Sequence, residues 1–482
     1  MSLRGASQHP PEPLLVAGQW RATQQTQSVV NPYTGEVVHE VSLADGAAVE
    51  EAIAGAGRGA RQLAALPAYR RSDILEKISR GLAADHDALA NLITEETGKP
   101  ITDSKTEVSR SISTFKFAAQ EALRIGGEVV PMETMPIGEG RIAFTQRIPL
   151  GSVLAITPFN FPLNLSAHKL APAIAAGNSV ILKPPPQAPG ICLWLGKIAL
   201  ASGLPPEALS ILPCSNALAE TMARDERIKM LSFTGSAKVG WYLKDIAGKK
   251  KILLELGGNA GVVIADDADI PWAVKRCVRG AFVHAGQTCI SVQRIFVAKS
   301  IVEDFLRAFL EETKKLTMGN PTDPATFLGP MVDKRALDKT EQIVKEAVAQ
   351  GARVLLGGKR SDPFFQPTVL DNAPEDCAAV CEEAFSPLAV LHRFDTFDEA
   401  LSRLNRTRYG LQAGVFTQNL DRAMRAASVI EAGAVIINDI PTYRVDSMPY
   451  GGIKDSGFGR EGLRYAIEAM TETKLIVINT KK

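Results

Sequence analysis

The sequence has almost no net charge, because its 54 lysines and arginines are balanced by 53 aspartates and glutamates. A chain with a formal charge of +1 has no overall field to gather polyanions or anionic lipids. No apolar run approaches the roughly 18 residues of a membrane helix, and residues 1–13 lack the apolar core of a signal peptide. These absences predict a cytoplasmic protein with no nucleic-acid partner and no membrane partner.

Cysteine is scarce and irregularly spaced, with six thiols at positions 192, 214, 277, 289, 377 and 381. This distribution indicates free thiols in a reducing compartment and not a disulfide framework. Cys377 and Cys381 have the spacing of half a metal site, with His392 downstream, but no second pair stands at ligand spacing. We therefore predict no metal site. Internal repeats and low-complexity tracts are also missing, which excludes solenoid and linker interpretations.

What the sequence does contain is 482 residues, enough for two to three structural units at roughly 150 residues each. Between Asp45 and Leu123 apolar residues recur at helical spacing, and Gly126 and Gly127 close this segment. From Gly151 onward short apolar runs alternate with helix-length stretches, which predicts a doubly wound parallel sheet of nucleotide-binding type. The expected strands of this sheet are 152–156, 179–182, 209–212, 230–233 and 252–256.

After about Asp266 the alternation resumes, which predicts a second α/β unit. Its expected strands are 292–297, 389–394, 414–416 and 434–437. Two segments, 141–148 and 475–479, fit neither unit and are typical of an exposed β-ribbon. Unpaired strands of this kind usually pair with another subunit, so they are the candidates for oligomerisation.

One thiol and one carboxylate stand out as candidates for chemistry. Cys289 ends Gly286-Gln287-Thr288-Cys289, a short turn before a strand, where backbone amides can lower the pKa of a sulfur. Taken alone, such a cysteine is more often an inert structural thiol. Glu255 ends a very apolar strand, where a carboxylate is costly unless it is paired, solvated or used as a base. It can equally be a strand-end residue that caps nearby amides.

Three more segments follow predicted strands, at the edge where parallel sheets bind ligands. Asn160, in Pro158-Phe159-Asn160-Phe161-Pro162, can donate to an oxyanion or simply form a turn between two prolines. Lys183 precedes three prolines and can meet a ribose or a phosphate. Phe233-Thr234-Gly235-Ser236, with Gly240 one helical turn later, is typical of a strand, a glycine turn and a helix N-terminus, which can bind a pyrophosphate.

Together these segments resemble the aldehyde dehydrogenase superfamily, over a range from about Gly18 to Asn479. The branch they look most like handles lactaldehyde, glyceraldehyde 3-phosphate without phosphorylation, or phosphonoacetaldehyde. The motifs occur in the family's order: Thr157-Pro158-Phe159-Asn160-Phe161-Pro162, Lys183-Pro184, Phe233-Thr234-Gly235-Ser236, Glu255-Leu256-Gly257-Gly258, Gly286-Gln287-Thr288-Cys289, Glu383-Ala384-Phe385 and Pro449-Tyr450-Gly451-Gly452.

The resemblance implies oxidation of an aldehyde to a carboxylic acid with a nicotinamide cofactor. Cys289 would attack the aldehyde carbon, and the Asn160 side chain with the Cys289 backbone amide would hold the oxyanion. After hydride transfer, Glu255 would activate the water that hydrolyses the thioester. Lys169 and Glu461 match positions that support proton movement from this base, although structural salt bridging explains them equally well.

The resemblance also implies a cofactor site, in which Phe385 packs near the nicotinamide and Glu383 binds its ribose. Where many members have an acidic residue, this chain has Pro186, which cannot repel a 2′-phosphate. We therefore expect NADP to be accepted at least as well as NAD. The residues expected to contact the cofactor are Ile156, Thr157, Pro158, Phe159, Lys183, Pro186, Gly235, Ser236, Gly240, Leu256, Gly257, Glu383 and Phe385.

The substrate pocket is expected to be polar, which predicts a short polar aldehyde as substrate. Donors from arginine or histidine go unpaired beside an apolar substrate but pair with a hydroxyl or an anionic group. Among such aldehydes a hydroxyaldehyde is favoured over a semialdehyde, because related succinate-semialdehyde enzymes carry arginine where this chain has His168. Alternatively, Arg110 and Arg444 only bridge acidic neighbours. The residues expected to line the pocket are Arg110, Leu165, His168, Thr288, Arg444 and Tyr450.

The predicted fold is α/β, with a doubly wound cofactor domain, a second α/β catalytic domain and a small β-ribbon for oligomerisation. The expected NAD(P)-binding domain is 1–130 with 150–256, and the catalytic domain is 257–440. The ribbon is expected at 131–149 and 465–482, and 441–464 returns along the active site. The ribbon predicts a homodimer or a tetramer.

Two alternatives remain beside the dehydrogenase. In a cysteine esterase or hydrolase without a redox cofactor, His284, expected on the preceding helix, or Glu255 would serve Cys289. This alternative leaves the segment at Gly235 unexplained. The other is a catalytically silent structural relative, which the intact Cys289, Glu255 and Asn160 disfavour.

Overall fold

The structure of the chain is a computed structural model that describes residues 10–480. The first α/β unit is built on an eight-stranded sheet. The five central strands are parallel and confirm the predicted sheet. The strand order is β2 (Gln19–Arg21), β1 (Leu14–Val16), β9 (Leu209–Ile211), β8 (Ser179–Lys183), β7 (Ser152–Ile156), β10 (Met230–Thr234), β11 (Lys251–Glu255) and β23 (Gly457–Phe458).

Helices cover both faces of this sheet, because successive side chains of each strand point to opposite sides. In β7, Val153 and Ala155 belong to one hydrophobic core and Leu154 and Ile156 to the other. The first core is shared with α2 (Ala68–Ala84), α3 (His86–Thr97), α4 (Ile101–Ala122), α5 (Pro162–Ala176) and α6 (Pro189–Ala201). The second is shared with α1 (Gly46–Ala65), α7 (Asn216–Arg224) and α8 (Ala237–Ile246).

The segment between Asp45 and Leu123 forms four helices and not one amphipathic stretch. Breaks fall where the sequence cannot continue a helix: Pro67 precedes α2, and Gly98 ends α3 in a left-handed conformation before Pro100. Two short strands, β3 (Thr26–Val30) and β4 (Val37–Ser42), form a hairpin before the first helix.

The second α/β unit contains a seven-stranded sheet, parallel except for its first strand. Its order is β14 (Arg353–Leu356), β17 (Thr368–Asp371), β18 (Leu388–Phe394), β13 (Arg294–Ala298), β12 (Gly261–Ile264), β20 (Gln412–Phe416) and β21 (Ala434–Ile437). Strands β12, β14 and β17 were not predicted. The four predicted strands lie within one to two residues of their expected positions.

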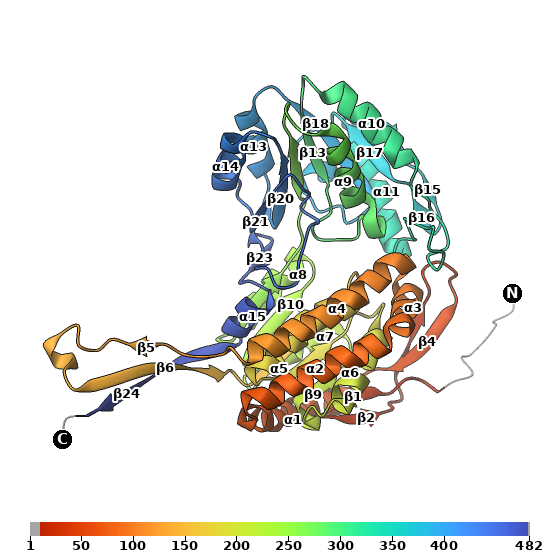
Figure 1. Cartoon of the computed structure of the whole chain (residues 1–482). Helices are drawn as coiled ribbons and strands as arrows, with labels where there is room; N and C mark the ends of the chain where they lie inside the picture. The colour runs from red at the N-terminus through yellow and green to blue at the C-terminus, as the bar shows by residue number, and fades with distance from the viewer. Residues whose placement is uncertain (1–9, 481–482) are drawn as a thin grey trace.

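Helices again lie on both faces of the second sheet (Figure 1). One face packs against α9 (Ile270–Phe282), α10 (Val302–Lys314), α11 (Lys334–Ala349) and α12 (Ala378–Cys381), and the other against α13 (Phe397–Asn405) and α14 (Leu420–Val429). Smaller strand pairs are β15 (Arg360–Ser361) with β16 (Phe364–Phe365), and β19 (Tyr409–Gly410) with β22 (Ile453–Lys454). Across residues 10–480, no helix is long and apolar enough to cross a membrane.

A long antiparallel ribbon projects from the first unit (Figure 1). It consists of β5 (Val129–Val130), β6 (Arg141–Pro149) and β24 (Thr471–Asn479), with Thr471 opposite Pro149 and Asn479 opposite Arg141. Its limits differ from the expected 131–149 and 465–482. The helix α15 (Leu463–Ala469) packs on α4 and α5 and places Leu463 and Ile467 in the first core, so the C-terminal strand of the ribbon begins only at Thr471.

The segment expected to return along the active site, 441–464, contains two short strands that pair with different parts of the molecule. Its strand β22 pairs with β19 near the second sheet, whereas β23 pairs antiparallel with β11 and completes the first sheet. Tyr450, just before β22, and Glu461, just after β23, face each other in an isolated antiparallel bridge. The loop that carries Arg444 and Tyr450 is therefore anchored at both of its ends.

Candidate active site

Cys289 lies in a reversal of the chain that follows α9. His284 and Ala285 have left-handed backbone angles, with φ of 50° and 54°, and Gly286 follows with φ of 68°. A Cβ atom on Gly286 would come within 2.0 Å of the Ser386 carbonyl oxygen, so only glycine fits this turn. His284 thus lies in a 3-10 turn (Val283–Gly286) and not on the preceding helix as expected.

The Cys289 thiol is held by a side chain and not by backbone amides. Its Sγ lies 3.1 Å from the Tyr450 hydroxyl oxygen. Burial raises the pKa of the Cys289 thiol to about 11, and the hydrogen bond to Tyr450 acts in the opposite direction. The expected lowering by the turn is therefore wrong for this structure, because the amides of Gln287 and Thr288 bond to carbonyls within the turn itself.

Asn160 contacts the same turn from the first unit. Its loop joins β7 to α5, and its Nδ2 donates to the Gln287 carbonyl oxygen over 3.0 Å. A carboxamide nitrogen has two hydrogens, so the second stays available to another acceptor. Within residues 10–480 no carbonyl accepts a hydrogen bond from the Cys289 backbone amide. Both donors that were expected to hold an oxyanion therefore have free capacity, and Asn160 and Cys289 line the same cavity.

A cavity of about 230 Å³ opens beside Cys289. Five of the six residues predicted to bind substrate line it: Arg110, Leu165, Thr288, Arg444 and Tyr450. The cavity has five cationic side chains and two carboxylates in its wall. Polar residues of the cavity wall that were not predicted from the sequence include Lys99, Asp103, Glu107, Arg276, Arg279 and Thr442.

His168 is the substrate residue that the structure contradicts. It is 2% exposed and absent from the cavity wall, and its Nε2 lies 2.8 Å from Asp446 Oδ1. Burial, with the nearby Arg444 guanidinium, lowers the pKa of His168. The prediction failed because every residue of α5 is buried, so its sequence does not reveal which side faces the cavity.

Asp446 also binds Arg110, which donates from Nε over 3.1 Å and from Nη2 over 2.7 Å. Burial opposes ionisation of Asp446, but His168 and Arg110 outweigh it and lower the pKa of this carboxyl. Arg444 donates from Nη2 to Glu461 Oε2 over 3.2 Å. Arg110 and Arg444 therefore line the cavity and bridge acidic neighbours at the same time.

Two further arginines come from α9. Arg276 and Arg279 are one helical turn apart, so they share a face, and this i, i+3 spacing was the available signal. Arg276 donates from Nε to Asp439 Oδ1 over 2.6 Å. Arg279 Nη2 lies 3.6 Å from Asp103 Oδ1 and its side chain is 53% exposed, so this arginine is loosely held at the rim.

A buried ion pair between Lys99 and Glu107 fixes the wall of the cavity near Asn160. The Glu107 Oε1 accepts hydrogen bonds from the backbone amides of Leu163 and Asn164, over 2.9 and 3.1 Å. These amides belong to the first turn of α5, where a carboxylate is stabilised by the helix dipole. The start of α5, and with it the preceding Asn160 loop, is thereby held against α4.

Glu255 lies at the end of β11 with 3% of its surface exposed. Within the described chain neither of its carboxylate oxygens has a hydrogen-bond partner. Burial, and next the nearby Glu461 carboxylate, raise the pKa of Glu255 well above its ordinary value. Gly451 leaves room for it, since a Cβ atom there would lie 2.9 Å from Glu255 Oε1. A buried carboxyl with no partner and a raised pKa has the properties of a general base.

Lys169 and Glu461 form an ion pair behind Glu255. The Lys169 Nζ lies 3.2 Å from Glu461 Oε1 and donates to Ser232 Oγ over 3.1 Å. Burial opposes ionisation of Glu461, but Lys169, His168 and Arg444 lower its pKa. This pair is compatible with both interpretations given above, a structural salt bridge and a proton path.

The predicted cofactor segments meet at one edge of the first sheet. Ile156, Lys183 and Leu256 lie at or directly after the carboxyl ends of β7, β8 and β11, three parallel strands of this sheet, and doubly wound sheets bind ligands at this edge. Ser236 is the N-cap that precedes α8, and a Cβ atom on Gly240 would come within 2.3 Å of Leu256 Cδ2. Thr157, Pro158, Phe159, Gly235 and Gly257 belong to the same loops at this edge.

Side chains of the second unit reach this edge too. Glu383 Oε1 accepts from the Gly258 backbone amide over 3.2 Å, and burial raises the pKa of Glu383 to about 7. The Phe385 ring meets the Phe159 ring edge-on, with centroids 6.0 Å apart. Lys183 is buried, which lowers the pKa of its ammonium, and Pro186 is exposed with its carbonyl accepting from Gln27 over 2.5 Å.

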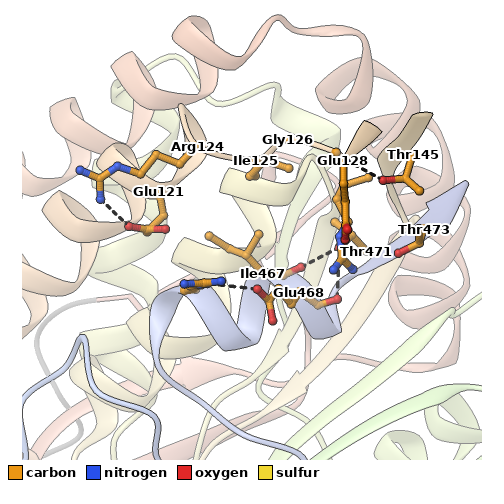
Figure 2. A pocket seen from close by; sticks show the side chains of 13 residues that line it. Glu121, Arg124, Ile125, Gly126, Glu128, Thr145, Ile467, Glu468, Thr471 and Thr473 are labelled. Atoms are coloured by element: carbon orange, nitrogen blue, oxygen red, sulfur yellow. Dashed lines mark hydrogen bonds and ion pairs between the residues drawn. The ribbon is translucent and has the colours of Figure 1, made fainter. Parts of the chain in front are cut away.

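A second cavity, of about 500 Å³, lies away from Cys289 at the base of the ribbon (Figure 2). Four of its charged residues already pair, Arg124 with Glu121 over 2.9 Å and Arg464 with Glu468 over 3.1 Å. The cavity lies between the end of α4, strand β6 and α15. It contains none of the residues expected to act in catalysis.

The sequence matches the model of the aldehyde dehydrogenase family over residues 20–476. It is 43% identical over 467 residues to a 3-sulfolactaldehyde dehydrogenase of Priestia aryabhattai, covering 97% of this chain and 98% of that one. It is 39% identical over 471 residues to a lactaldehyde dehydrogenase of Methanococcus vannielii, covering 97% of this chain and 100% of that one.

Solved structures of similar fold agree with these relatives. Aldehyde dehydrogenase 21 from Physcomitrella patens, in complex with the reaction product succinate, has a TM-score of 0.96 and 41% identity over 98% of this chain and 99% of that chain. The glyceraldehyde-3-phosphate dehydrogenase GapN from Methanocaldococcus jannaschii, complexed with NADP, has a TM-score of 0.91 and 38% identity over 95% of this chain and 100% of that chain.

Proposed function

Since the chain belongs to the aldehyde dehydrogenase family and is an NAD(P)-dependent oxidoreductase, we propose that it oxidises a short hydroxyaldehyde to the carboxylic acid through Cys289. The observation that carries the proposal is the cavity of about 230 Å³ that has Cys289 in its wall together with five cationic side chains. Such a wall suits a substrate with hydroxyl or anionic groups, because apolar groups would leave its donors unpaired.

The first half of the reaction belongs to Cys289 and Asn160. The thiolate attacks the aldehyde carbon, and the carbonyl oxygen becomes an oxyanion. The second Asn160 Nδ2 hydrogen and the free Cys289 backbone amide stabilise this oxyanion, an effect worth roughly 3 kcal/mol per donor. Bound NAD(P)⁺ supplies the hydride acceptor at this stage. The edge of the first sheet that carries Lys183, Ser236 and Glu383 would hold it.

The second half belongs to Glu255. A thioester on Cys289 must be hydrolysed, and a buried carboxyl without partners is a strong enough base to take a proton from water once it is ionised. Glu461 and Lys169 lie behind it and offer a path for this proton towards Ser232. Water adds to the thioester carbon, and breaking of the C–S bond frees the Cys289 sulfur as the leaving group, after which the carboxylic acid dissociates.

The hydroxyaldehyde is supported by the names of two relatives, which act on 3-sulfolactaldehyde and lactaldehyde. Thr288 and Thr442 in the cavity wall can accept or donate to a hydroxyl group, and the arginines suit an anionic tail. A semialdehyde with a carboxylate tail is the second candidate, because a similar structure holds succinate.

The cytoplasm is the proposed location, since none of the six cysteines forms a disulfide, as expected in a reducing compartment. A homodimer or tetramer is the proposed assembly. Its support is the projecting ribbon, on which Val129, Ile142, Leu475, Val477 and Ile478 are each 45–80% exposed.

The substrate assignment is tested by comparing kcat/KM for lactaldehyde, 3-sulfolactaldehyde, succinate semialdehyde and hexanal with each cofactor. We expect the two hydroxyaldehydes to have the highest kcat/KM, and the kcat/KM of hexanal to be at least tenfold lower. Arg279→Leu should weaken the anionic substrates selectively, whereas Arg307→Leu, which removes an exposed arginine on α10, should not. If hexanal had the highest kcat/KM, the polar-substrate proposal would be overturned. Aldehyde oxidation by Cys289→Ala would overturn the assignment of Cys289 as the nucleophile.

A further inference from the structure

The Tyr450 side chain links the nucleophile to the opposite wall of the cavity. Its hydroxyl lies 3.1 Å from Cys289 Sγ, and its ring lies under the Arg444 guanidinium, whose central carbon is 3.6 Å from the ring centroid. The same guanidinium donates to Glu461 Oε2 over 3.2 Å. One chain of contacts therefore runs from the thiol through the phenol and the guanidinium to the ion pair behind Glu255.

This chain is rigidly held. Tyr450 N donates to the Glu461 carbonyl over 3.0 Å and Glu461 N donates back over 2.6 Å, so the backbones of both residues are fixed. Tyr450 is 3% exposed and packs with Ile290 and Leu411 in a small apolar cluster around Cys289. Because both the backbone and the ring of Tyr450 are held, its hydroxyl stays within hydrogen-bond distance of the Cys289 sulfur.

We propose that Tyr450 is a catalytic residue that donates a hydrogen bond to the Cys289 thiolate, and that Arg444 is the positioning residue that holds its phenol there. The proposal rests on the proposed function, in which Cys289 is the nucleophile. It assigns to Tyr450 and Arg444 a role in preparing the thiol, before any aldehyde binds, in addition to lining the substrate cavity.

The direction of the hydrogen bond follows from the ionisation of the two groups. Burial and the neighbouring sulfur raise the pKa of the Tyr450 phenol well above 10, so the phenol keeps its proton at neutral pH. When the thiol ionises, its proton passes to solvent and the sulfur gains the negative charge. The phenol O–H then donates to that charge, and a hydrogen bond to an ionised acceptor is about twice as strong as a neutral one.

Arg444 strengthens this donor in two ways. A cation over the ring face draws electron density from the phenol, which makes its hydrogen more acidic. Its positive charge also acts directly on the sulfur. The groups that shift the pKa of Cys289 besides burial are Tyr450 and Arg444, which lower it, and Glu383 and Glu255, which raise it. Tyr450 and Arg444 thus offset the two carboxylates that disfavour the thiolate.

The test is the pH dependence of Cys289 alkylation by iodoacetamide in the full-length enzyme without substrate, with labelling at each cysteine followed by mass spectrometry. Tyr450→Phe removes only the hydroxyl and keeps the ring under Arg444. We expect the apparent pKa of Cys289 to rise by about one unit, so alkylation at neutral pH slows about tenfold. Tyr443→Phe, which removes a hydroxyl from a 44% exposed ring in the same loop, is the matched control and should leave the profile unchanged.

Rapid-mixing kinetics separate this role from a structural one. In Tyr450→Phe the burst of reduced cofactor should slow, whereas hydrolysis of the thioester, measured after the burst, should not. Arg444→Met should shift the alkylation profile in the same direction, and Arg444→Lys should restore part of it. Unfolding temperature and cofactor binding of each variant show whether it folds.

Two negative results would have different meanings. An alkylation profile identical in wild type and Tyr450→Phe would overturn the role of Tyr450, while loss of turnover in Cys289→Ala would leave the proposed function intact. Conversely, oxidation by Cys289→Ala would overturn the proposed function, whatever Tyr450 does to the thiol.

Discussion

At the scale of single residues, Glu255 is the side chain whose chemistry depends most on its surroundings. It is buried, has no hydrogen-bond partner in residues 10–480, and faces the Glu461 carboxylate. The carboxyl is therefore neutral over a wider pH range than an exposed one. Because only the ionised form can take a proton from water, hydrolysis of the thioester should depend on this raised pKa.

We expect the rate of thioester hydrolysis to increase as the pH rises through the raised pKa of Glu255. In Glu255→Gln this increase with pH should be absent. In rapid-mixing experiments the variant should show one burst of reduced cofactor and then stall. Unchanged steady-state turnover would remove Glu255 from the mechanism.

The same shift has a consequence for stability. A carboxyl whose pKa is higher in the folded state contributes stability below its unfolded pKa of about 4.5 and loses that contribution as the pH rises through the folded pKa. Glu255→Gln should therefore raise the unfolding temperature more at pH 8 than at pH 5. Glu226→Gln, at an exposed carboxylate, should show no such difference.

Pro186 offers a test of cofactor choice. Introducing Pro186→Glu places a carboxylate two residues after the loop begins at Pro184, where it can accept from ribose hydroxyls and repel a 2′-phosphate. We expect KM for NADP to rise at least tenfold relative to NAD. Gln350→Glu adds the same charge at the exposed end of α11 and should leave the ratio of the two KM values unchanged.

At the scale of elements, the reversal before Cys289 is the part of the site with the least tolerance for change. Gly286 and Gly248 have almost the same left-handed φ, 68° and 65°, but a Cβ atom would strike the Ser386 carbonyl at the first and meet nothing within 4 Å at the second. The two glycines therefore separate backbone strain from a clash.

Both substitutions to alanine impose a left-handed conformation on a residue with a Cβ atom, which costs about 1–2 kcal/mol. Gly248→Ala should lose about that much stability and keep full kcat. Gly286→Ala should lose more stability, and it should lower kcat at least a hundredfold because the turn must move to relieve the clash. Equal effects on kcat would show that the clash with Ser386 does not matter.

The first sheet could be predicted from the sequence because its strands are buried on both faces and therefore appear as continuous apolar runs, as in β10 and β11. Strand β12 (Gly261–Ile264) was missed because only five residues separate it from β11, so it does not fit the expected alternation of strands with helix-length stretches. The same limit applies to the site. The positions of Cys289, Glu255 and Asn160 follow from local motifs, but the cavity wall combines α4, α9 and the Arg444 loop, and no local pattern encodes that assembly.

At the scale of the whole molecule, the ribbon is the feature that a monomer explains least well. Its two main strands leave large apolar side chains exposed, with Leu475 and Val477 on one face and Ile142 and Ile478 on the other. An isolated ribbon of this kind is marginally stable in water, so contact with a second copy of the chain is its natural stabiliser.

We expect sedimentation to give a dimer or a tetramer of the 51.7 kDa chain at micromolar concentration. The double substitution Leu475→Lys with Val477→Lys should shift the protein towards the monomer, because it places charges in the proposed interface. Leu420→Lys with Met424→Lys, at exposed positions of α14 outside the ribbon, is the control. A wild-type protein that sediments as a monomer would contradict the assembly.

The late position of β23 and α15 in the chain affects how the protein is made. The first sheet and its core are completed only by these two elements, which come near the end of the sequence, after the whole second unit. At about 5–20 residues per second, a ribosome needs roughly 10 to 40 s to synthesise the chain between β11 and β23. During that time the edge of β11 is unpaired and part of the first core is uncovered. The nascent first unit is therefore exposed to aggregation for that interval, and a chaperone that binds this edge during translation should raise the yield of folded enzyme.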